Sequence, residues 1–218
     1  MIGAVVFDLD GVIVDSERVW DEVREQYTRE SGGRYTETAA RDMMGMSAPE
    51  WSRYMADVLG VPGTPAEIDA RVVELMLRRY GEAPPLIPGA VEAVRRVGAG
   101  WPLAIASSSN PELIEVVLRV SGLDRDVRIA VSSQEVARGK PAPDVYLEAA
   151  RRLGVDPTHC VAVEDSENGI RSAHAAGMPV VVIPNPHFAP ADDALALAAC
   201  TLDTIGELDA DVISRAGE

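Results

Sequence analysis

Cysteine and basic residues are scarce in this chain of 218 residues. Only Cys160 and Cys200 are present, each inside or beside an apolar segment, which is typical of a reduced, cytoplasmic protein and argues against a disulfide scaffold or a sulfur-ligated metal. Twenty Lys and Arg face 35 Asp and Glu, a formal net charge of −15. Such a field repels nucleic acid and anionic membranes, so an anionic substrate would need a locally positive site.

The chain also lacks a long hydrophobic run. No segment reaches the roughly 18 uninterrupted apolar residues of a spanning helix. The apolar residues 1–14 contain Asp8 and Asp10 and have no basic residue before Arg18, which indicates a strand and not a signal peptide. With 47% hydrophobic and 25% charged residues, the composition is that of a globular protein, and we expect no membrane partner.

Short β-branched runs alternate with helical periodicity along most of the sequence. Pro111 and Pro143 lie at two of the expected helix starts. This alternation predicts an α/β fold with a doubly wound, Rossmann-like parallel sheet. The expected strands are residues 3–7, 102–106, 128–131, 160–163 and 179–183.

One block, residues 16–85, shows helical periodicity and no convincing strand. Ser47 with Glu50 and Thr64 with Glu67 have the spacing of capping boxes at helix starts. We therefore expect an inserted, all-helical domain within these bounds.

The expected domains are an α/β catalytic core, residues 1–15 and 86–218, and a helical cap, residues 16–85. Ligands of open α/β sheets bind at the carboxyl ends of the strands. An insertion after the first strand would lie over that edge and could gate a site there. The alternative is an insertion that only adds bulk.

Acidic residues follow two of the expected strands directly. Asp8 and Asp10 come after the first strand, and Glu164 and Asp165 follow the fourth. Four converging acids without a counter-ion would repel one another strongly. A hard cation with oxygen ligands, with Mg²⁺ as the first candidate, would remove that repulsion. An acidic pair at a strand end can equally be a turn or a helix cap.

Hydroxyl and basic groups complete the set. Ser107 and Ser108 end the second strand, ahead of Asn110, and could hold an anion. The alternative is simple helix capping by Asn110. Lys140 lies between Gly139 and Pro141, although a lone lysine is usually solvated. A nucleophilic carboxylate, a second carboxylate, a cation, a hydroxyl and an ammonium together indicate phosphoryl transfer.

Four segments in this order resemble the haloacid dehalogenase superfamily. The resemblance covers roughly residues 1–15 and 86–190, and the helical block matches only in position and character. The segments are DLDGVIVDSE from residue 8, the run ending at Ser107, GKPAPDVY from residue 139, and VEDSENGIRSAHAAGM from residue 163.

The resemblance implies roles for individual residues. Asp8 would attack phosphorus to form an aspartyl phosphate, and Asp10 would serve as acid and then as base. Ser107 and Lys140 would bind the transferring group. An aspartate at position 10 is the mark of phosphate-transferring members, so dehalogenation is not expected.

The resemblance also implies a Mg²⁺ site. Asp8, the main-chain carbonyl of Asp10 and Asp165 would ligate the ion. Glu164 would be a further ligand or would support the others.

The opening segment and the place of the insertion resemble the β-phosphoglucomutase and sugar-phosphate phosphatase branch. Mutases carry a histidine where this chain has Trp20, and an arginine where it has Ala48 and Pro49. Both residues support a retained bisphosphate, so their absence favours a phosphatase acting on a small phosphorylated metabolite. A mutase is the alternative. Residues 45–47, Gly45, Met46 and Ser47, are the expected substrate loop of the cap.

A phosphorylatable receiver module is a rival of a different class. Receivers also combine acids, a hydroxyl and a lysine on a doubly wound sheet, but they need about half this length and carry their phosphoacceptor on an interior strand. His159 and His174 are interpreted as surface or packing residues. A monomer is expected.

Overall fold

The computed structural model describes residues 1–43, 46, 48–185 and 189–218. The chain divides into two compact units, one formed by Met1–Asp15 with Pro84–Glu218 and the other by Ser16–Ala83. Among the described residues, no helix is long and apolar enough to cross a membrane.

The first unit contains a parallel sheet of six strands in its described part, in the order β3-β2-β1-β4-β5-β6. This order confirms the predicted doubly wound α/β fold. The strands are β1 (Ala4–Phe7), β2 (Leu103–Ser107), β3 (Val127–Ser132), β4 (Cys160–Glu164), β5 (Val180–Val182) and β6 (Cys200–Thr201). The last strand was not predicted, because its two residues form no apolar run.

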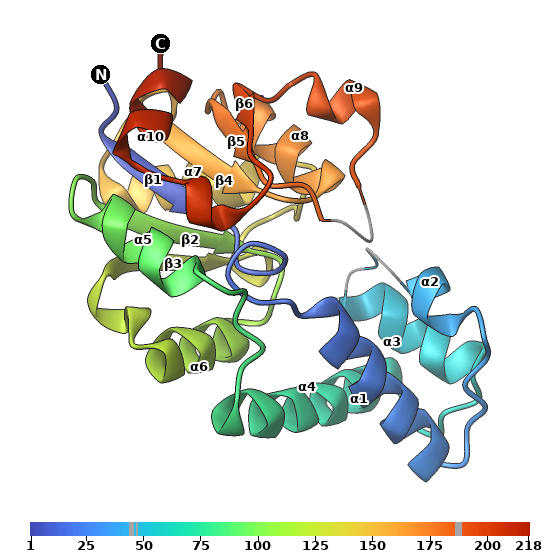
Figure 1. Ribbon diagram of the computed structural model, residues 1–218. Helices are drawn as coiled ribbons and strands as arrows, with labels where there is room; N and C mark the ends of the chain where they lie inside the picture. The colour runs from blue at the N-terminus through green and yellow to red at the C-terminus, as the bar shows by residue number, and fades with distance from the viewer. Residues whose placement is uncertain (44–45, 47, 186–188) are drawn as a thin grey trace. The chain divides into compact units, whose positions relative to one another are not determined.

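Helices cover both faces of this sheet (Figure 1). Buried residues of α7 and α8 pack against alternate residues of β1, β2, β4 and β5 on one face. In Figure 1, α5 and α10 lie in front of the sheet, on its other face. The helices are α5 (Ala90–Gly98), α6 (Pro111–Ser121), α7 (Asp144–Leu153), α8 (Glu167–Ala175), α9 (Asp192–Leu195) and α10 (Ala210–Ala216). Short 3₁₀ turns are η1 (Leu123–Arg125), η2 (Ser133–Glu135), η3 (Pro157–His159) and η4 (Ile205–Glu207).

The central strand determines where a site can form. Phe7 of β1 pairs with Ile105 of β2 on one side and with Val163 of β4 on the other. The residues that follow these three therefore leave the sheet at the same edge. Because the chain order reverses on either side of β1, this edge is the switch point at which open α/β sheets bind ligands.

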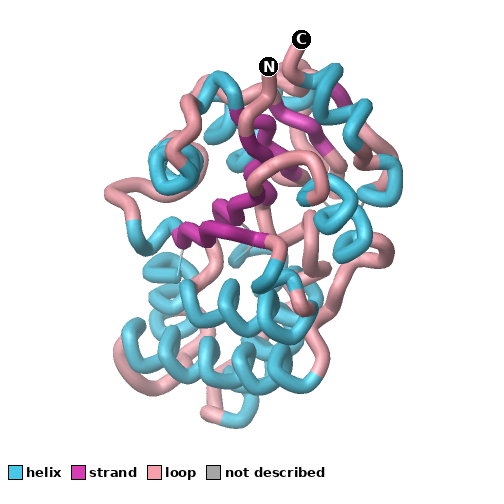
Figure 2. The backbone as a smooth tube through the Cα atoms, turned by 90° about the vertical axis from the view of Figure 1, so that its left-hand side faces the viewer, coloured by secondary structure: helices cyan, strands magenta, loops and turns pink. Residues whose placement is uncertain are grey.

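Helices are the only regular secondary structure among the described residues of the second unit, and the strands drawn in Figure 2 belong to the first unit. Its helices are α1 (Glu17–Glu30), α2 (Ala39–Met43), α3 (Ala48–Asp57) and α4 (Pro65–Glu82). The capping box of Thr64 is present: its side chain accepts from the Glu67 amide, and the Glu67 carboxylate accepts from the Thr64 amide at 2.8 Å. The other expected box depends on Ser47, which lies outside the described residues.

Candidate active site

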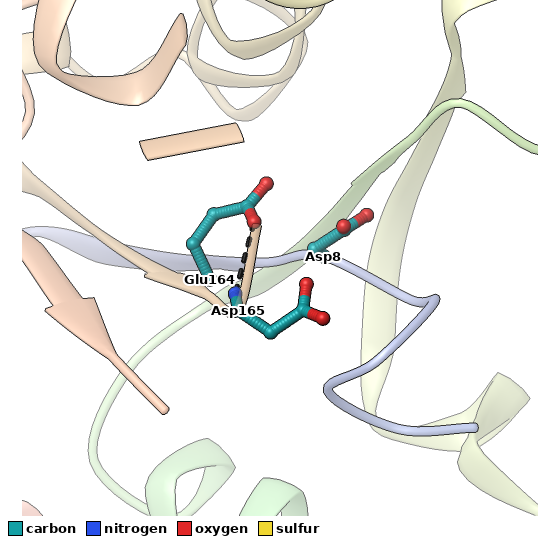
Figure 3. A group of neighbouring side chains, drawn as sticks. All are labelled: Asp8, Glu164 and Asp165. Atoms are coloured by element: carbon teal, nitrogen blue, oxygen red, sulfur yellow. Dashed lines mark hydrogen bonds between the residues drawn. The ribbon is translucent and has the colours of Figure 1, made fainter. Parts of the chain in front are cut away.

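Three carboxylates meet where β1 and β4 end (Figure 3). Asp8 follows β1, and its amide donates to the carbonyl of Val163 at 2.9 Å. Glu164 ends β4, and Asp165 follows it. Carboxylate oxygens of Asp8, Glu164 and Asp165 lie within 4.8 Å of one another, and all three residues are buried. Two strands far apart in the sequence thus supply one acidic cluster.

Gly11 allows this approach. Its φ of +78° is a conformation that side-chain-bearing residues rarely adopt. A Cβ at this position would lie 1.8 Å from Oδ2 of Asp165. The turn after Asp10 therefore needs glycine both for its backbone and for the space that the Asp165 carboxylate fills.

Lys140 supplies the positive charge of the cluster. Its Nζ lies 3.0 Å from Oδ1 of Asp8 and 2.6 Å from Oε1 of Glu164, and its side chain is 4% exposed. The lysine is therefore not a solvated surface residue. One ammonium facing three carboxylates leaves the cluster with an excess of negative charge.

Glu164 is engaged at both oxygens. Besides Lys140, Oε1 accepts from the Tyr146 hydroxyl at 2.8 Å, and Oε2 accepts from the amides of Asp165 and Ser166 and from the Ser166 hydroxyl. The Glu164 carboxylate thus accepts from five donors, and these bonds orient Lys140 and the backbone around Asp165. Tyr146 was not predicted. It lies on the buried face of α7, where an aromatic residue usually indicates packing alone.

Two serines, one at the end of β2 and one just after it, hold Asp10. The hydroxyls of Ser107 and Ser109 donate to Oδ2 of Asp10 at 3.1 and 2.7 Å, while Oδ1 is buried with no hydrogen-bond partner. The carbonyl of Ser109 accepts from the buried Ser132 hydroxyl at 2.6 Å. Ser108, which was predicted to bind phosphate, is exposed, and its side chain makes none of these bonds.

Helix capping does not account for the polar tract after β2. Asn110 precedes α6, but its side chain makes no capping hydrogen bond. The side chains of this tract that form bonds are directed to Asp10 instead.

The expected substrate loop in the helical unit is only partly described. Gly45 and Ser47 lie outside the described residues. Met46 is half-buried and, with residues of α3 that include Arg53 and Tyr54, lines a surface hollow of about 320 Å³. The structure therefore assigns no contact to Gly45 or Ser47.

The directions in which the pKa values of the cluster shift indicate that its negative charge is not fully compensated. Burial raises the pKa of Asp8 well above its ordinary value against the effect of Lys140. Burial and the nearby Glu164 do the same to the pKa of Asp165. Burial alone would lower the pKa of Lys140, but Asp8 and Glu164 raise it above its ordinary value.

A hard divalent cation fits this donor set. Oδ1 of Asp165 is buried and lacks a hydrogen-bond partner. The neighbouring donors are carboxylate oxygens, which Mg²⁺ and similar ions prefer. A cation here would satisfy the orphaned oxygen and reduce the repulsion within the cluster.

Comparison with known families decides the family of the chain. A family profile described as "haloacid dehalogenase-like hydrolase" matches residues 2–177. The chain belongs to the haloacid dehalogenase-like hydrolase family. The predicted family and its hydrolase character are thereby confirmed.

Similar members of the haloacid dehalogenase-like family cover nearly the whole chain. Hexitol phosphatase B of Escherichia coli K12 is 34% identical over 215 residues, which are 95% of this chain and 94% of that protein. The structure of CbbY from Rhodobacter sphaeroides in complex with phosphate superimposes with a TM-score of 0.87 at 26% identity, covering 98% of this chain and all of that one. A putative β-phosphoglucomutase from Thermotoga maritima has a TM-score of 0.79 at 28% identity, covering 98% and 99%.

Gly169 provides a test of the packing around Glu164. A Cβ on Gly169 would lie 1.8 Å from Oε1 and 2.1 Å from Oε2 of Glu164. We expect Gly169→Ala to lower the free energy of unfolding by about 2 kcal/mol or more, measured by urea denaturation.

Gly81→Ala is the matched control, because nothing lies within 4 Å of its Cβ position in α4. It should leave the free energy of unfolding unchanged or raise it by up to about 1 kcal/mol. Equal effects of the two substitutions would contradict the described position of Glu164.

Proposed function

We propose that this protein is a Mg²⁺-dependent phosphatase that hydrolyses a small sugar or metabolite phosphate through an aspartyl phosphate on Asp8. The observation that carries the proposal is the buried contact of Asp8 with Lys140, next to an Asp10 held by two serine hydroxyls. The relative named as a hexitol phosphatase supports a phosphorylated polyol or sugar as substrate class.

Asp8 has one oxygen available for attack. Oδ1 accepts from the Leu9 amide at 2.7 Å and lies 3.0 Å from Lys140 Nζ, whereas no hydrogen bond to Oδ2 occurs among the described residues. Oδ2 would attack phosphorus, and the bond from phosphorus to the ester oxygen would break. Lys140 would favour the ionised form of the Asp8 carboxylate, against the effect of burial on its pKa.

Asp10 would move the protons of both half-reactions. Its Oδ2 is fixed by Ser107 and Ser109, so the orphaned Oδ1 is free to serve the reaction. It would give a proton to the departing alcohol, then take a proton from the water that attacks the aspartyl phosphate. The second step releases inorganic phosphate and restores Asp8.

The remaining groups would neutralise the phosphoryl oxygens. The Ser107 hydroxyl and the Lys140 ammonium are the protein donors for this task. When bound, Mg²⁺ would supply further neutralisation of the same charge, and Asp8, the main-chain carbonyl of Asp10 and Asp165 would hold it. The saturated hydrogen bonding of Glu164 supports a positioning role for this residue.

Hydrolysis is preferred over mutase chemistry. A mutase must retain a bisphosphate and exclude water, which requires cationic groups on the distal phosphate. Trp20 stands where a mutase would carry His, and Ala48 and Pro49 stand where it would carry Arg. The relative with the higher identity is named as a phosphatase. The cap role of the helical unit, the monomeric state and the cytoplasmic location stay predictions.

Substitution at Asp8 tests the nucleophile. Asp8→Asn should abolish release of inorganic phosphate from a panel of sugar and polyol phosphates, because the amide is nearly isosteric but cannot attack phosphorus. Asp10→Asn should lower kcat by about 10² to 10⁴-fold. Asp15→Asn changes an exposed acid of the same unit and should behave as the wild type. If Asp8→Asn still releases inorganic phosphate at a substantial rate, Asp8 is not the nucleophile.

Metal removal tests the cation site. Chelation with EDTA should remove activity and Mg²⁺ should restore it, whereas Ca²⁺ should bind without supporting turnover because its coordination is larger and looser. Mg²⁺ should also raise the melting temperature of the wild type by mass action, and Asp165→Asn should reduce that rise. Full activity in protein verified to be metal-free would contradict this part of the proposal.

A further inference from the structure

Lys140 is the only lysine of this chain, whose other permanently basic side chains are all arginines. A lysine carries a compact charge on a flexible stem, so the position of that charge depends on the groups around it. The Nζ of Lys140 lies 3.0 Å from Oδ1 of Asp8 and 2.6 Å from Oε1 of Glu164. Two of its three N–H groups can serve these carboxylates, and the third is left for a phosphoryl oxygen.

Tyr146 shares the Glu164 oxygen that accepts from Lys140. The Tyr146 hydroxyl donates to Oε1 at 2.8 Å, and the residue is fully buried. Because a carboxylate oxygen has two lone pairs, the hydroxyl takes one of them and confines the ammonium to the other. The hydroxyl therefore restricts the side from which Lys140 approaches Glu164.

The ring of Tyr146 borders the same ammonium. The Nζ of Lys140 lies 5.1 Å from the ring centroid, within the range of a cation–π contact. The ring attracts the ammonium, whereas the hydroxyl restricts its place on Oε1. A phenylalanine would keep the ring and lose the hydroxyl, so the two effects can be separated.

Glu164 is held too firmly to compensate for a lost donor. Its Oε2 accepts from the amides of Asp165 and Ser166 and from the Ser166 hydroxyl, and the residue is fully buried. Loss of the Tyr146 hydroxyl would leave a buried lone pair of Oε1 without its donor. Lys140 is the flexible donor next to that lone pair, so we expect the ammonium to move.

We propose that Tyr146 is a positioning residue, whose hydroxyl holds the Lys140 ammonium where its remaining N–H meets the phosphoryl group attacked by Asp8. This role rests on the proposed function. A slightly displaced ammonium still attracts an anionic substrate, because charge attraction changes slowly with distance. Its hydrogen bond to the phosphoryl oxygens in the transition state depends far more on distance and direction. Loss of the hydroxyl should therefore affect kcat more than KM.

The kinetics of Tyr146→Phe test this split. In saturating Mg²⁺, kcat for sorbitol 6-phosphate and for p-nitrophenyl phosphate should fall about tenfold or more, whereas KM should change by less than about threefold. The two esters should be affected equally, because Lys140 acts on the phosphoryl group and not on the leaving oxygen. Val145→Ala, which removes packing at another buried residue of α7, should leave kcat and KM unchanged.

Nuclear magnetic resonance reports on the ammonium without any turnover. Because Lys140 is the only lysine, protein grown with lysine labelled with ¹³C and ¹⁵N gives one Nζ resonance that needs no assignment. Its chemical shift is read through the adjoining Cε protons, so rapid exchange of the ammonium protons does not hide it. Tyr146→Phe should shift this resonance, and Val145→Ala should leave it in place.

A double variant tests whether Tyr146 acts through Lys140. In a Lys140→Met background, Tyr146→Phe should cause no further fall in kcat, because the group that the hydroxyl positions is gone. If Lys140→Met does not fold, Lys140→Arg takes its place in the cycle, since a planar guanidinium does not reproduce the geometry of the ammonium.

Four results would overturn the positioning role of Tyr146. They are a wild-type kcat in Tyr146→Phe, an unshifted Nζ resonance in that variant, an equal fall in kcat with and without Lys140, and the same fall in Val145→Ala. A wild-type protein that hydrolyses neither ester would instead reject the proposed function. The Nζ resonance would then still decide whether the Tyr146 hydroxyl holds Lys140.

Discussion

Lys140 places a single buried ammonium between two carboxylates at the ends of neighbouring strands, Asp8 directly after β1 and Glu164 at the end of β4. These acids could not share the edge of the sheet without it, because burial and mutual repulsion would favour their neutral forms. Other features of the site serve the same arrangement. Tyr146 holds Glu164, and Gly11 and Gly169 leave room for the carboxylates of Asp165 and Glu164.

The two units follow a common physical logic. In the α/β unit the acidic cluster has excess negative charge and orphaned oxygens, and in the helical unit the Nε of Arg24 is buried without a hydrogen bond among the described residues. Folding alone satisfies neither of them, and each costs stability. Such deficits are expected where a ligand completes the structure, because a site optimised for binding is not optimised for the stability of the unliganded protein.

The fold was predictable because its signals are local and strong. Buried parallel strands such as β1 and β4 are continuous apolar runs in the sequence. Because the carboxyl ends of parallel strands meet at one edge of the sheet, the sequence predicts that Asp8 and Asp165 lie close together. The two-residue β6 has no such run. The choice between Ser108 and Ser109 depends on how the chain turns after β2, which spacing alone does not encode. Tyr146 was missed because it lies on a buried helix face, where the sequence shows the face but not the polar contact with Glu164.

The central claim is that Asp8 becomes covalently phosphorylated, and it can be tested by trapping. The enzyme is mixed with Mg²⁺ and a turning-over phosphate ester, quenched in denaturant, treated with borohydride and digested for mass spectrometry. Borohydride reduces an acyl phosphate to an alcohol, so this account predicts homoserine in place of Asp8 in the amino-terminal peptide, and none in the Asp8→Asn variant. The same trapping is done with Asp10→Asn, in which the aspartyl phosphate should break down slowly. The account is contradicted if this variant releases phosphate while Asp8 stays unmodified, or if the reduced residue lies at another position.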